Sequence, residues 1–206
     1  MGKGRLEAFS DGVLAIIITI MVLELKVPRG EPGSDGVGAL LALLPIFGSY
    51  VLSFVFIAIY WNNHHHMLHA SERVNGSILW ANVHLLFWLS LVPFVTAWMG
   101  ENHFAPVPVA AYGVVMLMSG VAFTVLARTL VWLHGPDSTL ARALGSDLKG
   151  WTSLVLYAAA IPLAFVDRWL ALGTYVCVAA MWLIPDRRIE RIIAPAPTHS
   201  REHSSL

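Results

Sequence analysis

The chain has 206 residues, of which 57% are hydrophobic and only 13% are charged, and its formal net charge is zero. Soluble domains carry about 25% charged residues, so this composition excludes an ordinary soluble protein and indicates an integral membrane protein. Zero net charge gives no electrostatic basis for binding nucleic acid, and a single cysteine, Cys177, excludes an internal disulfide.

A helix that crosses a membrane needs roughly 20 mostly apolar residues, and the sequence predicts six of them in an all-α membrane protein. Pro45, Pro93 and Pro162 fall inside these segments. Residues 1–192 are expected to form one six-helix transmembrane domain, and residues 193–206, which show no periodicity, a disordered cytoplasmic tail. The predicted spans are 8–27, 38–61, 78–99, 107–133, 150–166 and 168–185.

Positive charges are divided unevenly between the two sides of this six-span arrangement. The side of the two termini carries ten of the 13 Lys and Arg residues, and the other side carries three, Lys26, Arg29 and Arg168. Because loops rich in Lys and Arg stay in the cytoplasm, both termini are predicted to be cytoplasmic. A five-span or seven-span arrangement would scatter this asymmetry.

The first span begins with a polar cluster of Arg5, Ser10 and Asp11. Ionisable groups at the edge of a membrane span cost free energy, and they usually serve packing, gating or transport. Further along the span, side chains three, four and seven residues apart share one helix face. This face has two interpretations. It either packs against lipid and other helices, or it lines an ion path that several copies of the helix surround and constrict. Its candidate pore residues are Ile16, Thr19, Ile20 and Leu23, and Phe9 and Gly12 extend it.

The two charged residues Asp11 and Arg5 lie on different sides of this helix. Asp11 lies about 140° around the helix from Ile16, so its carboxylate is predicted to point into the protein, where it needs a partner. Arg5 lies within about 20° of the Ile16 face. Its expected partner is Asp11 of the same or a neighbouring subunit, Glu7, or helix carbonyl groups, because an unpaired arginine at a pore mouth would repel cations.

Glu24 stands at the outer end of the first span, one residue beyond Leu23. It has two interpretations, which the sequence leaves open. It is either an interfacial charge paired with Lys26 or a cation-attracting group in an outer vestibule.

Four histidines lie between positions 64 and 69, at the end of the second span. His65 and His69 have the i, i+4 spacing that can hold a metal ion on a helix. The segment has no H-E-x-x-H glutamate, and no nearby Asp or Cys completes a tetrahedral ligand set, so no metal site is predicted. Instead we expect Asp11, His65 and Asn82 to form a hydrogen-bonded network that holds the first helix in place.

The first span resembles the R-x-x-x-F-S-D signature of the prokaryotic TMEM175-type potassium channel family, through Arg5, Phe9, Ser10 and Asp11. Gly12 and the later Thr19 continue the likeness. The resemblance implies a homotetramer in a prokaryotic plasma membrane, whose first helices line a potassium-permeable pore without a P-loop selectivity filter. It also implies no enzymatic activity and no cofactor beyond permeant K⁺. The implied narrowest ring is Ile16, and the further pore positions are Thr19, Ile20 and Leu23.

A second class of function is a proton-coupled cation or metal transporter that uses Asp11 and the histidines at 64–69. Such a transporter would show saturable flux coupled to pH. An intramembrane enzyme is not indicated, because no paired carboxylates or Ser/His/Asp set occur at one depth. The expected partners are the lipid bilayer, further copies of this chain, and K⁺ with other monovalent cations.

Overall fold

A computed structural model describes residues 2–27, 36–138, 141–142 and 147–183. Over these residues the chain is helical and contains no strand, which confirms the all-α prediction. The predicted tail at 193–206 lies outside the described residues. The elements are α1 (Lys3–Met21) with the 3-10 turn Val22–Glu24, α2 (Val37–Leu41), α3 (Leu44–His69), α4 (Gly76–Ser90), α5 (Val92–Glu101), α6 (Pro106–His134), α8 (Leu148–Val166) and α9 (Arg168–Leu183).

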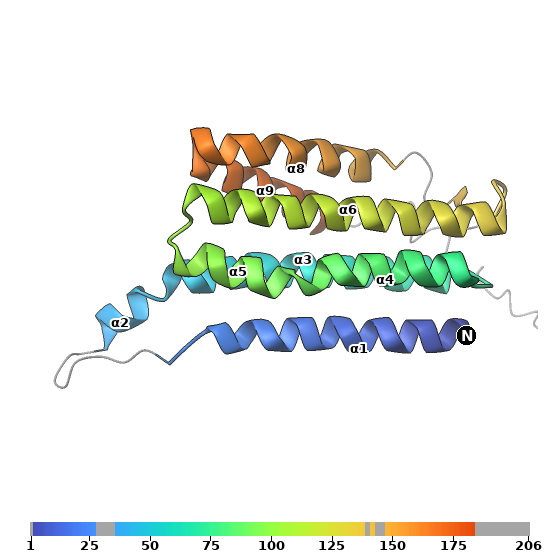
Figure 1. Ribbon diagram of the computed structural model, residues 1–206, viewed down its shortest axis with the longest axis horizontal. Coiled ribbons are helices and arrows are strands. Elements are labelled where there is room, and N and C mark those ends of the chain that lie inside the picture. Colours follow the sequence, from blue (N-terminus) through green and yellow to red (C-terminus); the bar gives the residue numbers. More distant parts are fainter. Residues whose placement is uncertain (1, 28–35, 139–140, 143–146, 184–206) are drawn as a thin grey trace, which may run out of the picture.

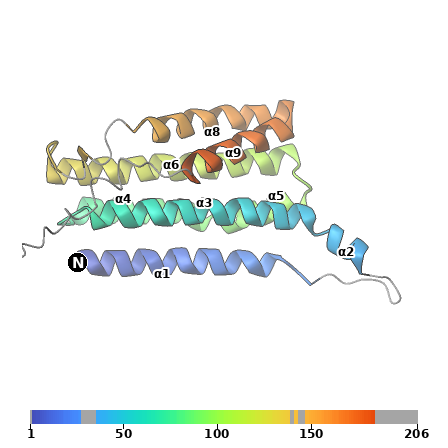
Figure 2. The same ribbon diagram turned by 180° about the vertical axis from the view of Figure 1, so that it is seen from behind.

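The long helices run side by side in layers (Figures 1 and 2). Helix α1 forms one outer layer and packs against α3, α4 and α5. Helix α6 packs on α4 and α5, and α8 lies on the side of α6 that is remote from α1. Helix α9 packs against α8, α6 and α3. The N-terminus of α1 lies at the same end of the bundle as the last turn of α6 and the start of α8 (Figure 1).

Five helical stretches are long and apolar enough to cross a membrane, and α9 is a shorter apolar helix of 16 residues. The six predicted spans overlap these five stretches and α9, with shifted ends. The first begins at Lys3 and the second continues to His69, because helices continue past the apolar segment into polar residues. Residues 184 and 185 of the sixth predicted span lie outside the described part. The five stretches are Lys3–Glu24, Val37–His69, Gly76–Glu101, Pro106–His134 and Leu148–Val166.

Proline and capping residues set several of these helix ends. Pro45 and Pro93 stand in the first turns of α3 and α5, where a missing backbone N–H is tolerated. Asn75 and Asp147 cap α4 and α8, since their side chains accept hydrogen bonds from the first helical turn. Only Asp167 separates α8 from α9, so the predicted tight hairpin is confirmed.

Buried polar groups join the helices on the inner side of the bundle. The Ser53 hydroxyl donates to the Tyr112 hydroxyl over 3.1 Å and lies 2.6 Å from that of Thr96. The Tyr175 hydroxyl donates to the Val109 carbonyl over 3.0 Å. Such bonds matter in a membrane protein because lipid offers no alternative partner. They fix the inner helices as a scaffold for α1.

Candidate functional site

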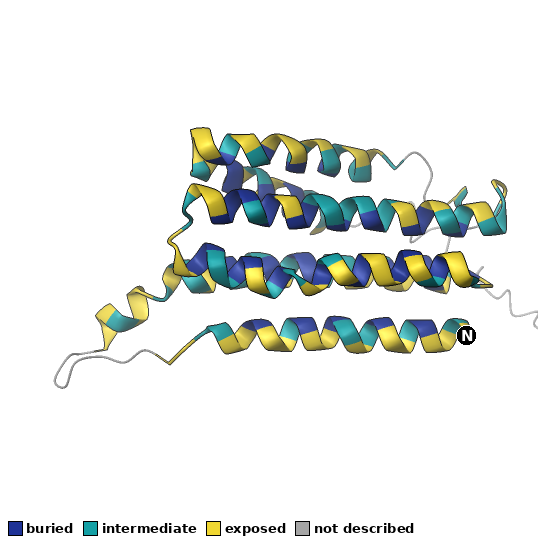
Figure 3. Ribbon diagram, in the orientation of Figure 1, coloured by how far each residue is buried: buried dark blue, intermediate teal, exposed yellow. Residues whose placement is uncertain are grey.

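Helix α1 is divided along its whole length into a packed face and an open face (Figure 3). On the open face, 52% of Phe9, 57% of Ile16 and 72% of Leu23 is exposed. In a single chain no other part of the described structure covers this apolar surface. It includes one exposed hydroxyl residue, Thr19. The packed face consists of Leu6, Ser10, Leu14, Ile17 and Met21, and the open face of Arg5, Phe9, Gly12, Ile16, Thr19, Ile20 and Leu23.

The hydroxyl group of Thr19 is oriented by its own helix. Its Oγ1 lies 3.0 Å from both the Ala15 and the Ile16 carbonyl oxygens, to which it can donate its hydrogen. A hydroxyl has one hydrogen and two acceptor lone pairs. Because the hydrogen is held against the backbone, the acceptor side of the Thr19 oxygen is left toward the open face.

A buried triad of polar side chains holds the packed face of α1. The Ser10 hydroxyl donates to the Leu6 carbonyl over 2.9 Å and accepts from the Asn82 amide nitrogen over 2.9 Å. Asn82 thereby directs its oxygen to His64, whose Nε2 lies 2.7 Å away and donates to it. All three side chains are buried. The triad joins α1, α3 and α4 through bonds that lipid cannot replace.

Asp11 bonds to a different residue of α3. The Trp61 indole N–H donates to the Asp11 carboxylate over 3.0 Å, and the Trp61 ring stacks on His65 at a centroid distance of 6.0 Å. The expected network of Asp11, His65 and Asn82 is therefore wrong. Asn82 bonds to His64, while His65 supports the ring of the residue that binds Asp11.

The open face begins with Arg5, as its helical phase predicts. Its side chain forms no ion pair within the described residues. Neither of its expected acidic partners is free for it, since Glu7 lies 3.8 Å from Lys3 and Asp11 accepts from Trp61. The expected pairing of Arg5 with Glu7 or Asp11 is wrong in a single chain.

Known proteins share this architecture. The family described as "Endosomal/lysosomal potassium channel TMEM175" matches residues 5–93. A protein from Chryseobacterium sp. (strain P1-3), named "Potassium channel HX13_20290", is 52% identical over 191 residues, which are 93% of this chain and 97% of the relative. The chain belongs to the TMEM175 family.

Two further relatives are similar to this chain over most of their length, one in sequence and one in structure. "Potassium channel B446_29190" from Streptomyces collinus is 33% identical over 84% of this chain and 87% of the relative. The crystal structure of a lysosomal potassium-selective channel TMEM175 homolog from Chamaesiphon minutus superposes with a TM-score of 0.75 and 30% identity, covering 93% of this chain and 98% of that one. The segment matched by the family contains the open face of α1 and the whole Ser10–Asn82–His64 triad.

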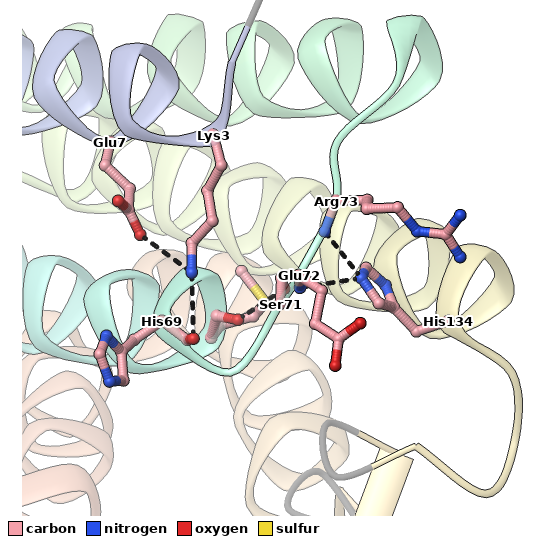
Figure 4. Close-up of polar contacts among 8 residues, drawn as sticks. Lys3, Glu7, His69, Ser71, Glu72, Arg73 and His134 are labelled. Carbon is pink, nitrogen blue, oxygen red and sulfur yellow. Dashed lines mark hydrogen bonds and ion pairs between the residues drawn. The ribbon is translucent and has the colours of Figure 1, made fainter.

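In this TMEM175 protein the start of α1 is also held by the turn between α3 and α4 (Figure 4). The Lys3 ammonium donates to the carbonyl of His69, the last residue of α3, over 3.1 Å. The turn is itself bound to α6, because Nε2 of His134 accepts from the backbone N–H groups of Glu72 and Arg73 over 3.1 and 3.2 Å. Nδ1 of His134 faces the Leu130 carbonyl at 2.8 Å and carries the hydrogen.

At the opposite end of α1, a groove separates its outer turns from α5. Glu24 lines this groove, but it does not pair with Lys26, which contacts Glu101 of α5 at 3.2 Å. The interfacial ion pair expected for Glu24 is therefore wrong. The groove is lined by Val13, Ile16, Ile17, Ile20 and Glu24 of α1 and by Ser90, Pro93, Phe94, Ala97, Trp98 and Glu101.

The histidines at 64–69 do not gather metal ligands. Within the part of the chain that the structure describes, no three His, Cys, Asp or Glu side chains lie close enough to hold an ion. His65 stacks on His69 at 6.1 Å, and His64 is bound to Asn82. His64 thus joins α3 to α4, while His65 and His69 pack on each other within α3.

Proposed function

We propose that this TMEM175 protein is a potassium-permeable cation channel of a prokaryotic plasma membrane, formed by four copies whose α1 helices surround the pore. The observation that carries the proposal is the open face of α1, an apolar stripe interrupted by one hydroxyl group and begun by an arginine. The printed names of the relatives, which are potassium channels, support the same conclusion.

Exposed apolar side chains alone would suit contact with lipid. The packed face argues for more, because the Ser10–Asn82–His64 triad and the Asp11–Trp61 bond together fix the rotation of α1 about its axis. A helix that only anchors a protein in lipid needs no such fixed rotation. Fixed rotation is needed when one particular face must line a path.

The homotetramer follows from the geometry that a pore requires. One exposed helix cannot enclose a path, so several copies of α1 must face a common axis. The groove between α1 and α5 offers each copy a surface for its neighbour. Four copies would stack rings of Ile16, Thr19, Ile20 and Leu23 over about 10 Å of the axis, at 1.5 Å per residue.

The rings suggest how conduction is controlled. Branched aliphatic rings at Ile16, Ile20 and Leu23 narrow the path and expel water, which is how hydrophobic constrictions gate channels. Thr19 supplies an oxygen between them that replaces part of the hydration shell of an ion. The chain has no T-V-G-Y-G-like segment, so its preference for K⁺ over Na⁺ is expected to be modest. Ten of 13 basic residues on the side of the termini support their cytoplasmic location.

Ion flux from the purified protein in liposomes tests this function. A potassium gradient should drive flux without a pH gradient, and Ile16→Asn should raise it severalfold by wetting the constriction. Val155→Asn is the matched control, because Val155 is an equally apolar, 64% exposed residue on the remote helix α8. The mass of the purified assembly should be four times the 22.6 kDa of one chain.

Other outcomes would overturn parts of the proposal. Flux unchanged by both Ile16→Asn and Leu23→Asn would remove α1 from the pore. Saturable flux that requires a pH gradient, and that is lost in a folded Asp11→Asn protein, would favour the proton-coupled transporter.

A further inference from the structure

A second groove opens between α6 and α8, on the side of the bundle remote from α1. It lies at the end where α1 begins, where α6 continues past the first turn of α8 (Figure 1). Because it is far from the open face of α1, the proposed pore does not use it. Its lining includes Thr124, Ala127, Arg128 and Trp132 of α6, and Asp147 and Trp151 at the start of α8.

Arg128 places a positive charge in this groove. It lies six residues before the end of α6 at His134, which is about 9 Å along the helix axis. Its guanidinium stands over the Trp151 ring, 5.4 Å from the ring centroid. No carboxylate among the described residues lies within ion-pair distance of it. A guanidinium near the end of a membrane helix can bind an anionic group at the membrane surface.

Asp147 places a negative charge in the same groove. It is the N-cap of α8, and one of its oxygens accepts from the Gly150 backbone N–H over 2.9 Å. No ion pair joins it to Arg128 in the described part of the chain. The groove thus presents one cation and one anion that are not paired with each other and together carry no net charge.

The surroundings of these charges match the boundary between lipid and water. Trp132 and Trp151 are 79% and 53% exposed at the rim, and tryptophan is enriched where acyl chains meet headgroups. Thr124, one turn before Arg128 on α6, and Ala127 also line the groove and offer small side chains against which an acyl chain can lie.

We propose that this groove binds a phospholipid whose headgroup carries both a phosphate and a primary ammonium, the phosphatidylethanolamine class. The phosphate binds the Arg128 guanidinium, the ammonium donates to the Asp147 carboxylate, and an acyl chain follows α6. A phosphatidylglycerol headgroup would leave Asp147 unpaired beside a second anion. Phosphatidylcholine has no ammonium hydrogen to donate, so it gains only the phosphate contact.

Lipid binding to the purified full-length protein tests the site. The probes are dioleoyl phosphatidylethanolamine, phosphatidylcholine and phosphatidylglycerol, and native mass spectrometry counts the lipids retained. We expect phosphatidylethanolamine to be retained preferentially and Arg128→Gln to weaken its binding about tenfold, as expected for loss of a charge-assisted hydrogen bond. Asp147→Asn keeps a capping residue and should abolish the preference over phosphatidylcholine while leaving phosphate binding.

A matched control separates this site from general effects of charge. Arg168 stands over Trp169 with the same 5.4 Å geometry, but at the opposite end of the bundle and outside the groove. Arg168→Gln should leave lipid retention unchanged. Equal retention of all three lipids by the natural protein, a preference for phosphatidylglycerol, or equal effects of Arg128→Gln and Arg168→Gln would each overturn the proposal.

Discussion

The two ends of α1 are attached to the bundle in very different ways. Near its start, buried Asn82 of α4 donates to Ser10, Trp61 of α3 donates to Asp11, and Lys3 donates to the last carbonyl of α3. Near its outer end, the polar attachment is the exposed contact of Lys26 with Glu101, and the rest is apolar packing of Ile17 and Met21. Buried polar bonds therefore fix the start of α1 more specifically than its outer end.

The largest loss of stability is expected from a substitution in the Ser10–Asn82–His64 triad, near the start of α1. Asn82→Leu removes the partners of both Ser10 and His64, and it should lower the free energy of unfolding by about 3 kcal/mol, since each buried unpaired group costs about 1–3 kcal/mol. Thermal unfolding in detergent measures the loss. Asn63→Leu is the control, because the Asn63 amide bonds only to the Ile59 carbonyl of its own helix. Equal losses in the two variants would contradict a special role for the triad.

A smaller loss of stability is expected from a substitution of Trp61, which binds Asp11 of α1. Trp61→Phe keeps an aromatic ring against His65 but removes the N–H that binds the Asp11 carboxylate. The expected loss is about 1.5 kcal/mol, as for one hydrogen bond to a charged group. Ion flux should change together with stability, because the rotation of the open face is less well fixed. A stable variant with ordinary flux would show that the triad alone is sufficient.

The smallest loss of stability is expected from a substitution of Lys26, at the outer end of α1. Lys26→Gln removes an exposed ion pair, and such pairs contribute about 0–1 kcal/mol. Thermal stability should therefore change little, and less still at high salt. A large drop in unfolding temperature would contradict the comparison between the two ends.

The sequence predicted the spans and the open face of α1 because both depend on local patterns. Apolar length reveals a span, and 3.6-residue periodicity reveals which side chains share a face. The choice of His65 over His64 failed because it depends on which face of α3 meets α4. A signal was present, since His64 lies seven residues after buried Ile57 and four before buried Leu68. That phase predicts an inward-facing His64.

The sequence contains no comparable pattern that shows which side chains of different helices meet. Lys26 and Glu101 are 75 positions apart, and Trp61 is 50 positions from Asp11. Only the folded arrangement shows that these groups meet, because each has several closer charged or polar neighbours in the sequence. The sequence likewise does not show the partner of Arg5, and the pairing of Glu24 with Lys26, one of two interpretations, is not formed within the described residues.

The orientation of the Thr19 hydroxyl has a consequence for the sign of the ions that pass. Its hydrogen is held by the carbonyls of Ala15 and Ile16, so a ring of four such groups would offer oxygen lone pairs and no N–H or O–H donors to the axis. A chloride ion that had lost part of its hydration would find nothing there to bind. A discrimination against anions would then arise without any acidic residue, from the direction of a single O–H bond in each subunit.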